Sequence, residues 1–134
     1  MTHLLTLLSL TLGCRGLSIN EVTTGETPEY PEVKAQRFVE PPGAVMRRAK
    51  AVADEMPGWQ NCSVPEPMHY HCEAVTPTLG FVDDVQIWVE PLGPTVTVLK
   101  VRSASRVGKG DLGANAKRIL AFQAAVEESL VRGE

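Results

Sequence analysis

The chain has 134 residues, which fits a single domain able to bury a workable core. A hydrophobic fraction of 43% and a charged fraction of 22% are ordinary for a globular protein. The net charge of -3 gives no reason to expect a nucleic-acid partner. We interpret the one modest basic cluster as solvated surface, with a local anion site as the alternative: Lys100, Arg102, Arg106 and Lys109.

Residues 1–16 differ from the rest and predict a membrane-targeting segment. Leu4 to Gly13 is uncharged and mostly apolar. It is too short for a helix to cross a hydrocarbon core about 30 Å thick, but it has the length of the hydrophobic region of a secretory signal. It ends at Gly13-Cys14, as in bacterial lipoprotein signals, whose cysteine is lipidated. We therefore predict export or anchoring through Cys14. A short hydrophobic helix packed on the domain, or a start placed too late in a longer signal, are the alternatives.

Residues 17–42 are predicted to form a linker, because glycines and prolines recur there among polar residues and disfavour regular helix. Within this linker, Glu32 to Val39 could add one short edge strand. The predicted domain then covers residues 43–134.

The domain begins with a predicted helix over Gly43 to Met56. Pro41-Pro42 precede it, as prolines often do at a helix start, and Pro57-Gly58 end it. Its apolar residues recur at helical spacing and form one stripe: Val45, Ala49, Val52 and Met56.

Four β-rich runs follow, and they predict two hairpins separated by short proline-containing turns. Alternation of apolar and polar residues in the third and fourth runs is typical of a half-buried sheet. The predicted strands are Trp59 to Val64, Met68 to Thr76, Val82 to Val89 and Thr95 to Ser103.

A last helix is predicted from Leu112 to Val131, and Asp111 is placed to cap its first turn. Its apolar stripe is Ile119, Phe122, Val126 and Leu130. A helix, four antiparallel strands and a helix predict an α+β fold. We expect a two-layer sandwich, in which two helices cover one face of a four- to five-stranded antiparallel sheet.

Cys62 and Cys72 lie on the two strands of the first hairpin. If the turn centres on Pro67, the two residues face each other at a distance near bonding range for a disulfide. Two small thiols buried on a core face remain the alternative, because free cysteine is commonly buried. A register slip of one residue would place the two on opposite faces.

The pattern His69, His71 and Glu73 places three possible ligands on one face of a strand, and such spacing can chelate zinc. No further ligand is identifiable, so we expect a solvated polar face and no metal. A second constellation joins Asp83-Asp84 to Arg102 and Arg106, where a bidentate ion pair could be a structural salt bridge or the floor of an anion-binding pocket.

The glycine-rich run Gly108 to Gly113 leads into the last helix and is interpreted as a loop rather than a nucleotide-binding motif. Asn115 and Arg118 share one face of that helix and could point back toward Asp84 and Arg102. These polar residues form the candidate ligand-binding site, whose members are Asp83, Asp84, Arg102, Ser103, Ser105, Arg106, Asp111, Asn115 and Arg118.

GFVDDVQIWV at Gly80 to Val89 and RSASRVGKGDLGANAKRI at Arg102 to Ile119 resemble the uncharacterised family numbered 1499 among the domains of unknown function. The upstream segment INEVTTGETPEYPEV resembles a bacterial branch of that family, with Glu21 in place of an aspartate. The resemblance covers Ile19 to the C-terminus. Many members carry a lipoprotein-like signal or a membrane segment, and plastid relatives exist. The resemblance implies a fold unit and a compartment but no reaction.

These patterns lead to three hypotheses. The first is a non-enzymatic module of the cell envelope, membrane-anchored or periplasmic, with a plastid lumen or secretion as alternatives. It would bind a small anionic ligand, a lipid or a protein partner through Arg102 and Arg106, oriented by Asp83, Asp84 and Asn115. The second is a hydrolase that pairs Ser103 or Ser105 with Asp84. The third is a structural polar network that locks the last strand to the last helix. No cofactor is expected.

Overall fold

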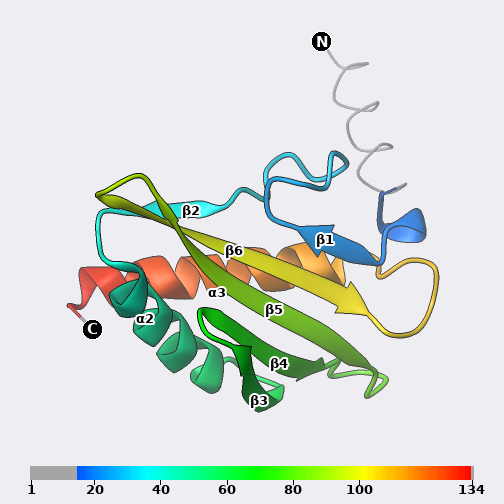
Figure 1. The fold of residues 1–134 in the computed structure, drawn as a ribbon. Coiled ribbons are helices and arrows are strands. Elements are labelled where there is room, and N and C mark those ends of the chain that lie inside the picture. The colour runs from blue at the N-terminus through cyan, green and yellow to red at the C-terminus, as the bar shows by residue number, and fades with distance from the viewer. Residues whose placement is uncertain (1–14, 134) are drawn as a thin grey trace.

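The computed structural model describes residues 15–133 and shows one antiparallel sheet with helices packed on one of its faces (Figure 1). The predicted α+β class with two layers is thereby confirmed. The apolar run up to Gly13, together with Cys14 and its predicted lipid, lies outside the described residues. Within residues 15–133, no helix combines the length and the apolarity needed to cross a membrane.

Four consecutive strands form the centre of the sheet, as the sequence predicts. They are β3 (Trp59–Glu66), β4 (His69–Val75), β5 (Val82–Leu92) and β6 (Val96–Ser105), each antiparallel to the next. β5 extends beyond its predicted end because Leu92 still pairs with Val96. The chain then reverses through Gly93, whose φ of 75° lies in the left-handed region that glycine adopts without strain.

Two helices cover one face of the sheet: α2 (Pro42–Glu55) and α3 (Ala114–Val131). α2 buries Val45 and Ala49 of its predicted stripe, and α3 buries Ile119, Phe122 and Val126. Leu130, the last member of the predicted α3 stripe, is 38% exposed because it lies one residue from the end of the helix.

Residues 17–42, predicted as a linker with one possible edge strand, contribute two strands to the sheet. These are β1 (Glu21–Thr23) and β2 (Gln36–Phe38), and both pair with β6. The sheet order is β1-β6-β5-β4-β3, with β2 joined to the other half of β6. The segment also buries core side chains, namely Val22, Tyr30, Val33 and Phe38. The segment is therefore part of the folded domain and not a linker before it.

A disulfide joins Cys62 of β3 to Cys72 of β4, with an S–S distance of 2.13 Å. Ser63 pairs with His71, which is the register that a turn centred on Pro67 predicts. The register shifts on both sides of this pair, and Asn61 takes a φ of 51° at one shift. The bond therefore fastens the edge strand at an irregular part of the hairpin, where the hydrogen-bond ladder is interrupted.

The two faces of the sheet differ in chemistry. Val85, Ile87 and Val89 of β5 are buried beneath the helices, together with Leu99 and Val101 of β6. Their neighbours alternate to the opposite side. We call that side the open face; it carries Glu73, Asp84, Gln86, Trp88, Lys100 and Arg102.

Candidate functional site

The sheet divides the predicted site into two halves. Asp83 is 3% exposed beneath the helices, whereas the side chain of Asp84 is 29% exposed on the open face. Consecutive residues of a strand point to opposite faces, so the same separation applies to Arg102 and Ser103. The residues that the sequence places in one cluster therefore form two networks with a β-sheet between them.

The first network lies beneath α3 and joins this helix to β5 and β6. Arg118 forms an ion pair with Asp83, with Nη2 2.8 Å from Oδ2. Its Nη1 donates to Ser103 Oγ at 3.0 Å and to Asn115 Oδ1 at 2.8 Å. Ser103 Oγ in turn donates to Asn115 Oδ1 at 2.6 Å. We call these four side chains, together with those of Ser105 and Asp111, the buried network.

Asn115 is the centre of the buried network and is fully buried. Its Nδ2 donates to Ser105 Oγ, to Asp111 Oδ2 and to the carbonyl of Asn20. Asp111 also accepts from the backbone N–H groups of Gly113 and Asn115, at 2.7 and 3.1 Å. It thus satisfies donors at the start of α3, as predicted, although the helix begins two residues later than expected.

The second network lies on the open face around Arg106. Its guanidinium forms a bidentate pair with Asp84 at 2.8 and 2.9 Å, and its Nη2 donates to Glu73 at 2.7 Å. His71 Nε2 lies 2.8 Å from Asp84 Oδ1. Asn61 Nδ2 donates to the other oxygen of Glu73 at 2.6 Å. We call these five residues the Arg106 network.

The electrostatics of the Arg106 network favour its charged form. The hydrogen bonds from Arg106, and to a smaller extent from His71, lower the pKa of Asp84 to about 2. Hydrogen bonds from Asn61 and then Arg106 lower the pKa of Glu73 as well. The carboxylates in turn raise the pKa of Arg106. Each charge therefore has an opposite charge in contact, and Arg106 is occupied by two carboxylates rather than vacant for an anionic ligand.

Arg102 belongs to a different part of the open face. It donates from Nε to Glu21 Oε1 at 2.6 Å, across the β1–β6 pairing. The two charges raise the pKa of Arg102 and lower that of Glu21, chiefly through this hydrogen bond. With Trp88 and Lys100, Arg102 lines a shallow hollow of about 370 Å³. The other lining residues are Glu21, Thr23, Glu26 and Glu90.

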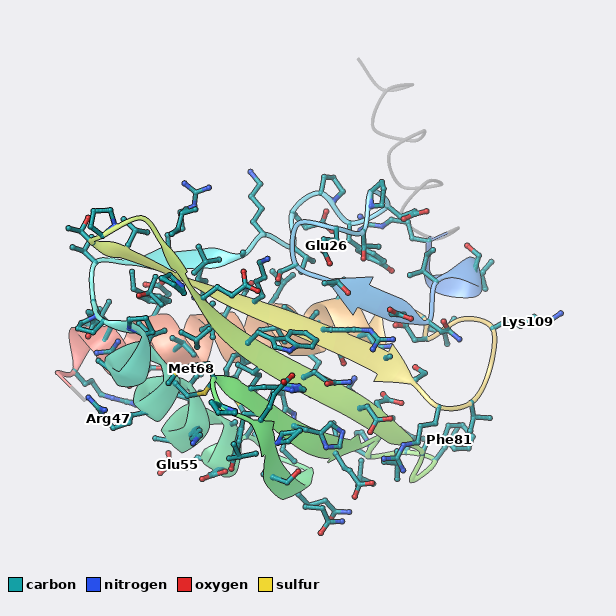
Figure 2. All side chains as sticks on the ribbon, in the orientation of Figure 1. Glu26, Arg47, Glu55, Met68, Phe81 and Lys109 are labelled. Atoms are coloured by element: carbon teal, nitrogen blue, oxygen red, sulfur yellow. A yellow bond between two sulfur atoms is a disulfide. The ribbon has the colours of Figure 1, made fainter. Side chains whose placement is uncertain are left out.

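Trp88 gives this hollow a rigid aromatic wall. Its ring stacks on that of His69 with centroids 4.9 Å apart and an angle of 17° between the planes. His69 is 8% exposed and its Nε2 lies 2.7 Å from Gln86 Oε1. Lys100, which pairs with Trp88 across β5 and β6, bonds Glu90 at 3.1 Å. Glu26 lies in the loop that follows β1 (Figure 2). We call this place the Trp88 hollow.

Several predicted contacts are corrected by these positions. Asp84 forms its bidentate pair with Arg106, not with Arg102. Asn115 and Arg118 point toward Asp83 and Ser103 instead of Asp84 and Arg102. Alternation along β5 and β6 places Asp84 and Arg102 on the open face, whereas Asn115 and Arg118 lie on the helix side of the sheet. Asp84 and Arg102 share the open face, but Arg102 bonds Glu21 instead.

The hydrolase hypothesis needs Asp84 beside Ser103 or Ser105. Both serines belong to the buried network, where their hydroxyls bond Asn115. Asp84 is on the other side of the sheet and is bound by Arg106 and His71. The geometry therefore does not assemble the expected nucleophile–carboxylate pair.

The predicted face of His69, His71 and Glu73 exists, but each side chain has a different partner, namely Gln86, Asp84 and Arg106. No group of three possible metal ligands comes together within residues 15–133.

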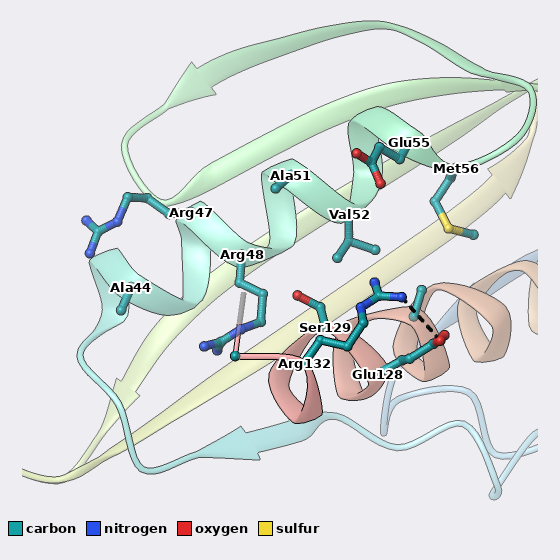
Figure 3. A pocket seen from close by; sticks show the side chains of 12 residues that line it. Ala44, Arg47, Arg48, Ala51, Val52, Glu55, Met56, Glu128, Ser129 and Arg132 are labelled. Atoms are coloured by element: carbon teal, nitrogen blue, oxygen red, sulfur yellow. Dashed lines mark hydrogen bonds and ion pairs between the residues drawn. The ribbon is translucent and has the colours of Figure 1, made fainter.

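A larger hollow of about 580 Å³ lies between α2 and α3 and contains none of the predicted site residues (Figure 3). Arg47, Arg48, Arg132 and Ser129 line it beside Val52 and Met56. Arg48 bonds Glu40 at 2.5 and 2.9 Å, and Arg132 bonds Glu128 at 3.3 Å. Two of its arginines, Arg48 and Arg132, are thus paired with carboxylates, as Arg102 and Lys100 are in the Trp88 hollow.

The family model for a protein of unknown function, DUF1499, matches residues 16–126. The chain belongs to this family. The match spans both networks and the Trp88 hollow, and it confirms the resemblance carried by the motif from Arg102 to Arg118. It begins at residue 16 and so includes the segment that composition alone assigns to a linker. A search of curated proteins finds no match to the chain.

Sequence reasoning missed three contributors to the two faces. The sequence predicts Trp88 in a strand and gives it no role, although a tryptophan on the polar side of an alternating strand indicates a binding surface. Asn61 and Asn20 could not be found, because each acts through a contact with a distant segment.

Proposed function

We propose that this DUF1499 protein is an exported, membrane-associated module without catalytic chemistry, and that the Trp88 hollow binds a small ligand carrying an anionic group. The observation that carries the proposal is the position of Arg102 beside Trp88 around one hollow. Because Arg102 and Trp88 lie on adjacent strands, the sheet fixes the position of the cation relative to the aromatic ring. Such a pair fits a ligand with both kinds of surface.

The ion pair between Arg102 and Glu21 is exposed and weak, so Arg102 can exchange it for a ligand. The Arg102 side chain is 37% exposed and that of Glu21 is 48% exposed. Exposed pairs of this kind contribute only about 0–1 kcal/mol, so an anionic group can replace Glu21 at little cost. Arg106 is held by two carboxylates, so we assign the main anion contact to Arg102, supported by Lys100.

Export is supported by two separate observations. The Cys62–Cys72 bond is a disulfide, and disulfides form and persist in oxidising compartments. The apolar run that ends at Cys14 has the pattern of a lipoprotein signal. Together they favour a location in the cell envelope, with the protein attached through its N-terminal segment.

The buried network has a structural role in this proposal. Ser103, Asn115 and Arg118 are bonded to one another, and Asp83 is bonded to Arg118. None of the four lines a hollow described above. They hold α3 on the sheet and so support the strands that carry Arg102 and Trp88. The part of the motif beneath α3 is therefore assigned to stability, and the part on the open face to binding.

The test is to purify the protein from its native host and identify by mass spectrometry what is attached to Cys14 and what co-purifies. We expect an acylated Cys14 and an anionic small molecule that Arg102→Ala loses. Lys34→Ala, which removes an exposed cation elsewhere, should retain it. A small molecule retained equally by both variants, or none at all, would overturn the assigned site. An unmodified chain in the cytosolic fraction would overturn the membrane association.

A further inference from the structure

We propose that the end of the domain where the N-terminal segment joins it rests on the lipid surface, with exposed apolar side chains of three segments entering the membrane interface. The proposal builds on the membrane association proposed above and specifies which part of the domain meets lipid. We call this part the loop end. Its exposed apolar residues are Leu17, Leu79, Phe81, Val107 and Leu112.

Three segments meet at the loop end. Figure 1 shows the start of the described chain, the β4–β5 turn and the β6–α3 loop at the same end of the molecule. The first is tied to the β6–α3 loop by hydrogen bonds from Leu112 N to Gly16 O at 2.8 Å and from Asp111 N to Ile19 O at 3.1 Å. The β5–β6 pairing ends at Asp83 and Ser105, so Phe81 and Val107 each lie two residues beyond the same pair.

The apolar residues of the loop end are strongly exposed. Leu112 is 75% exposed, Leu79 69%, Leu17 68%, Val107 61% and Phe81 45%. Single exposed apolar residues are common on soluble proteins and need no explanation. Here, however, they come from three separate segments and gather beside the point where the chain enters the domain. Figure 2 shows Phe81 and Lys109 directed outward at this end.

The entry point of the chain is rigid, and this determines the orientation of the domain. Arg15 donates to Glu29 O at 2.9 Å, bonds Glu32 at 2.9 Å and lies over the Tyr30 ring, 4.1 Å from its centroid. Cys14 is the next residue, and one residue spans at most ~3.6 Å of chain. A lipid on Cys14 would therefore hold the loop end against the bilayer with almost no linker between them.

The charge of the loop end suits an anionic lipid surface. Lys109 is exposed between Gly108 and Gly110 at the tip of the β6–α3 loop. The nearby carboxylates are already engaged: Asp111 with the start of α3, and Asp84 with Arg106. Apolar side chains beside an exposed lysine match the interface, where acyl chains lie beneath anionic headgroups.

The test uses the full chain with its native N-terminus, bound to phosphatidylethanolamine–phosphatidylglycerol vesicles. Tryptophan is placed at the loop end by Phe81→Trp or Val107→Trp, and at the opposite end by Val131→Trp, whose native side chain is 87% exposed. Bromine on the acyl chains quenches only tryptophans that reach them. The signal of the unsubstituted protein, with Trp59 and Trp88, is subtracted.

We expect brominated vesicles to quench the Phe81→Trp and Val107→Trp emission at least twofold more than that of Val131→Trp. Two loop-end variants guard against a folding defect in either one. Equal quenching of all three in protein that floats with the vesicles would overturn the loop-end orientation while leaving membrane association intact. Protein that does not float with the vesicles would instead contradict the proposed function itself.

Discussion

Asp83 and Asp84 are consecutive residues, yet each forms its ion pair on a different face of the sheet. Asp83 meets Arg118 at 2.8 Å beneath α3, and Asp84 meets Arg106 at 2.8 Å on the open face. The Asp83 side chain is 4% exposed and that of Asp84 is 29% exposed. Two adjacent carboxylates of one motif therefore have different physical roles, one inside the fold and one at its surface.

Removing the cation of the buried pair should strongly destabilise the domain. We expect Arg118→Met to lower the free energy of unfolding by about 3–5 kcal/mol, because it leaves Asp83 buried without its counter-charge. Urea denaturation followed by circular dichroism measures the loss. Arg102→Ala is the matched control, since its exposed pair with Glu21 should cost less than about 1 kcal/mol. Equal losses of unfolding free energy in the two variants would show that burial does not make the Asp83–Arg118 pair more important for stability than the Glu21–Arg102 pair.

Acid should weaken the Arg106 network by protonating Asp84. The pKa of Asp84 is lowered from 3.8 to about 2 by Arg106 and then His71, so its contribution is fully present above pH 4. The contribution is lost as pH falls from about 4 to 2, because the unfolded chain takes up the proton first. Urea denaturation at a series of pH values should show this slope in the wild type. Asp84→Asn should flatten it, whereas an unchanged slope would contradict the assignment.

The disulfide should stabilise the hairpin that carries Glu73 and His71. Cys62 and Cys72 are separated by 10 residues in sequence, and closing a loop of this size contributes about 2–3 kcal/mol. We expect dithiothreitol to lower the urea midpoint of the wild type accordingly. The double variant Cys62→Ala/Cys72→Ala should begin at the lower midpoint and respond to the reductant no further. If dithiothreitol lowers the midpoint of the double variant by the same amount, the effect of the reductant does not come from this disulfide.

Lys109 should contribute to lipid binding at the loop end. Each lysine near an anionic surface contributes roughly 1 kcal/mol, so Lys109→Gln should weaken partition onto phosphatidylglycerol vesicles about fivefold. Lys34→Gln removes an exposed lysine outside the three segments of the loop end and should have little effect. Sedimentation of the full chain with vesicles measures the partition. The difference between the variants should shrink as salt is raised, and a salt-independent difference would argue against an electrostatic contact.

The sequence predicted the elements whose signals are local. The strands from β3 to β6, both helices and the capping role of Asp111 follow from periodicity, turn residues and composition. β2 lies inside the expected edge strand from Glu32 to Val39, but β1 is not predicted, because it has three residues and exists through pairing with β6. Such short strands carry no periodic pattern of their own.

The division of the site between the two faces of the sheet can be predicted from the sequence. Residues adjacent in a strand alternate between faces, so Arg102 and Ser103 could not both join one cluster. The expected single cluster rests on closeness along the chain, which does not imply closeness in space. The partners of Arg106 were beyond reach for a different reason. Arg106 follows the last residue of β6, and Glu73 lies on β4, so their contact depends on the direction of a loop and the register of two pairings.

A crossed pair of variants should separate the stabilising half of the motif from the binding half. Ser103→Ala removes a hydroxyl that donates to Asn115 and accepts from Arg118, so we expect it to cost about 1–3 kcal/mol of stability. Because Ser103 is on the helix side, the molecule that co-purifies through Arg102 should be retained. Arg102→Ala should show the reverse: nearly native stability and loss of that molecule. Urea denaturation and quantitative mass spectrometry of the same preparations measure both effects. If Ser103→Ala releases the molecule while its unfolding curve stays native, the two faces are functionally coupled and the division argued for them is wrong.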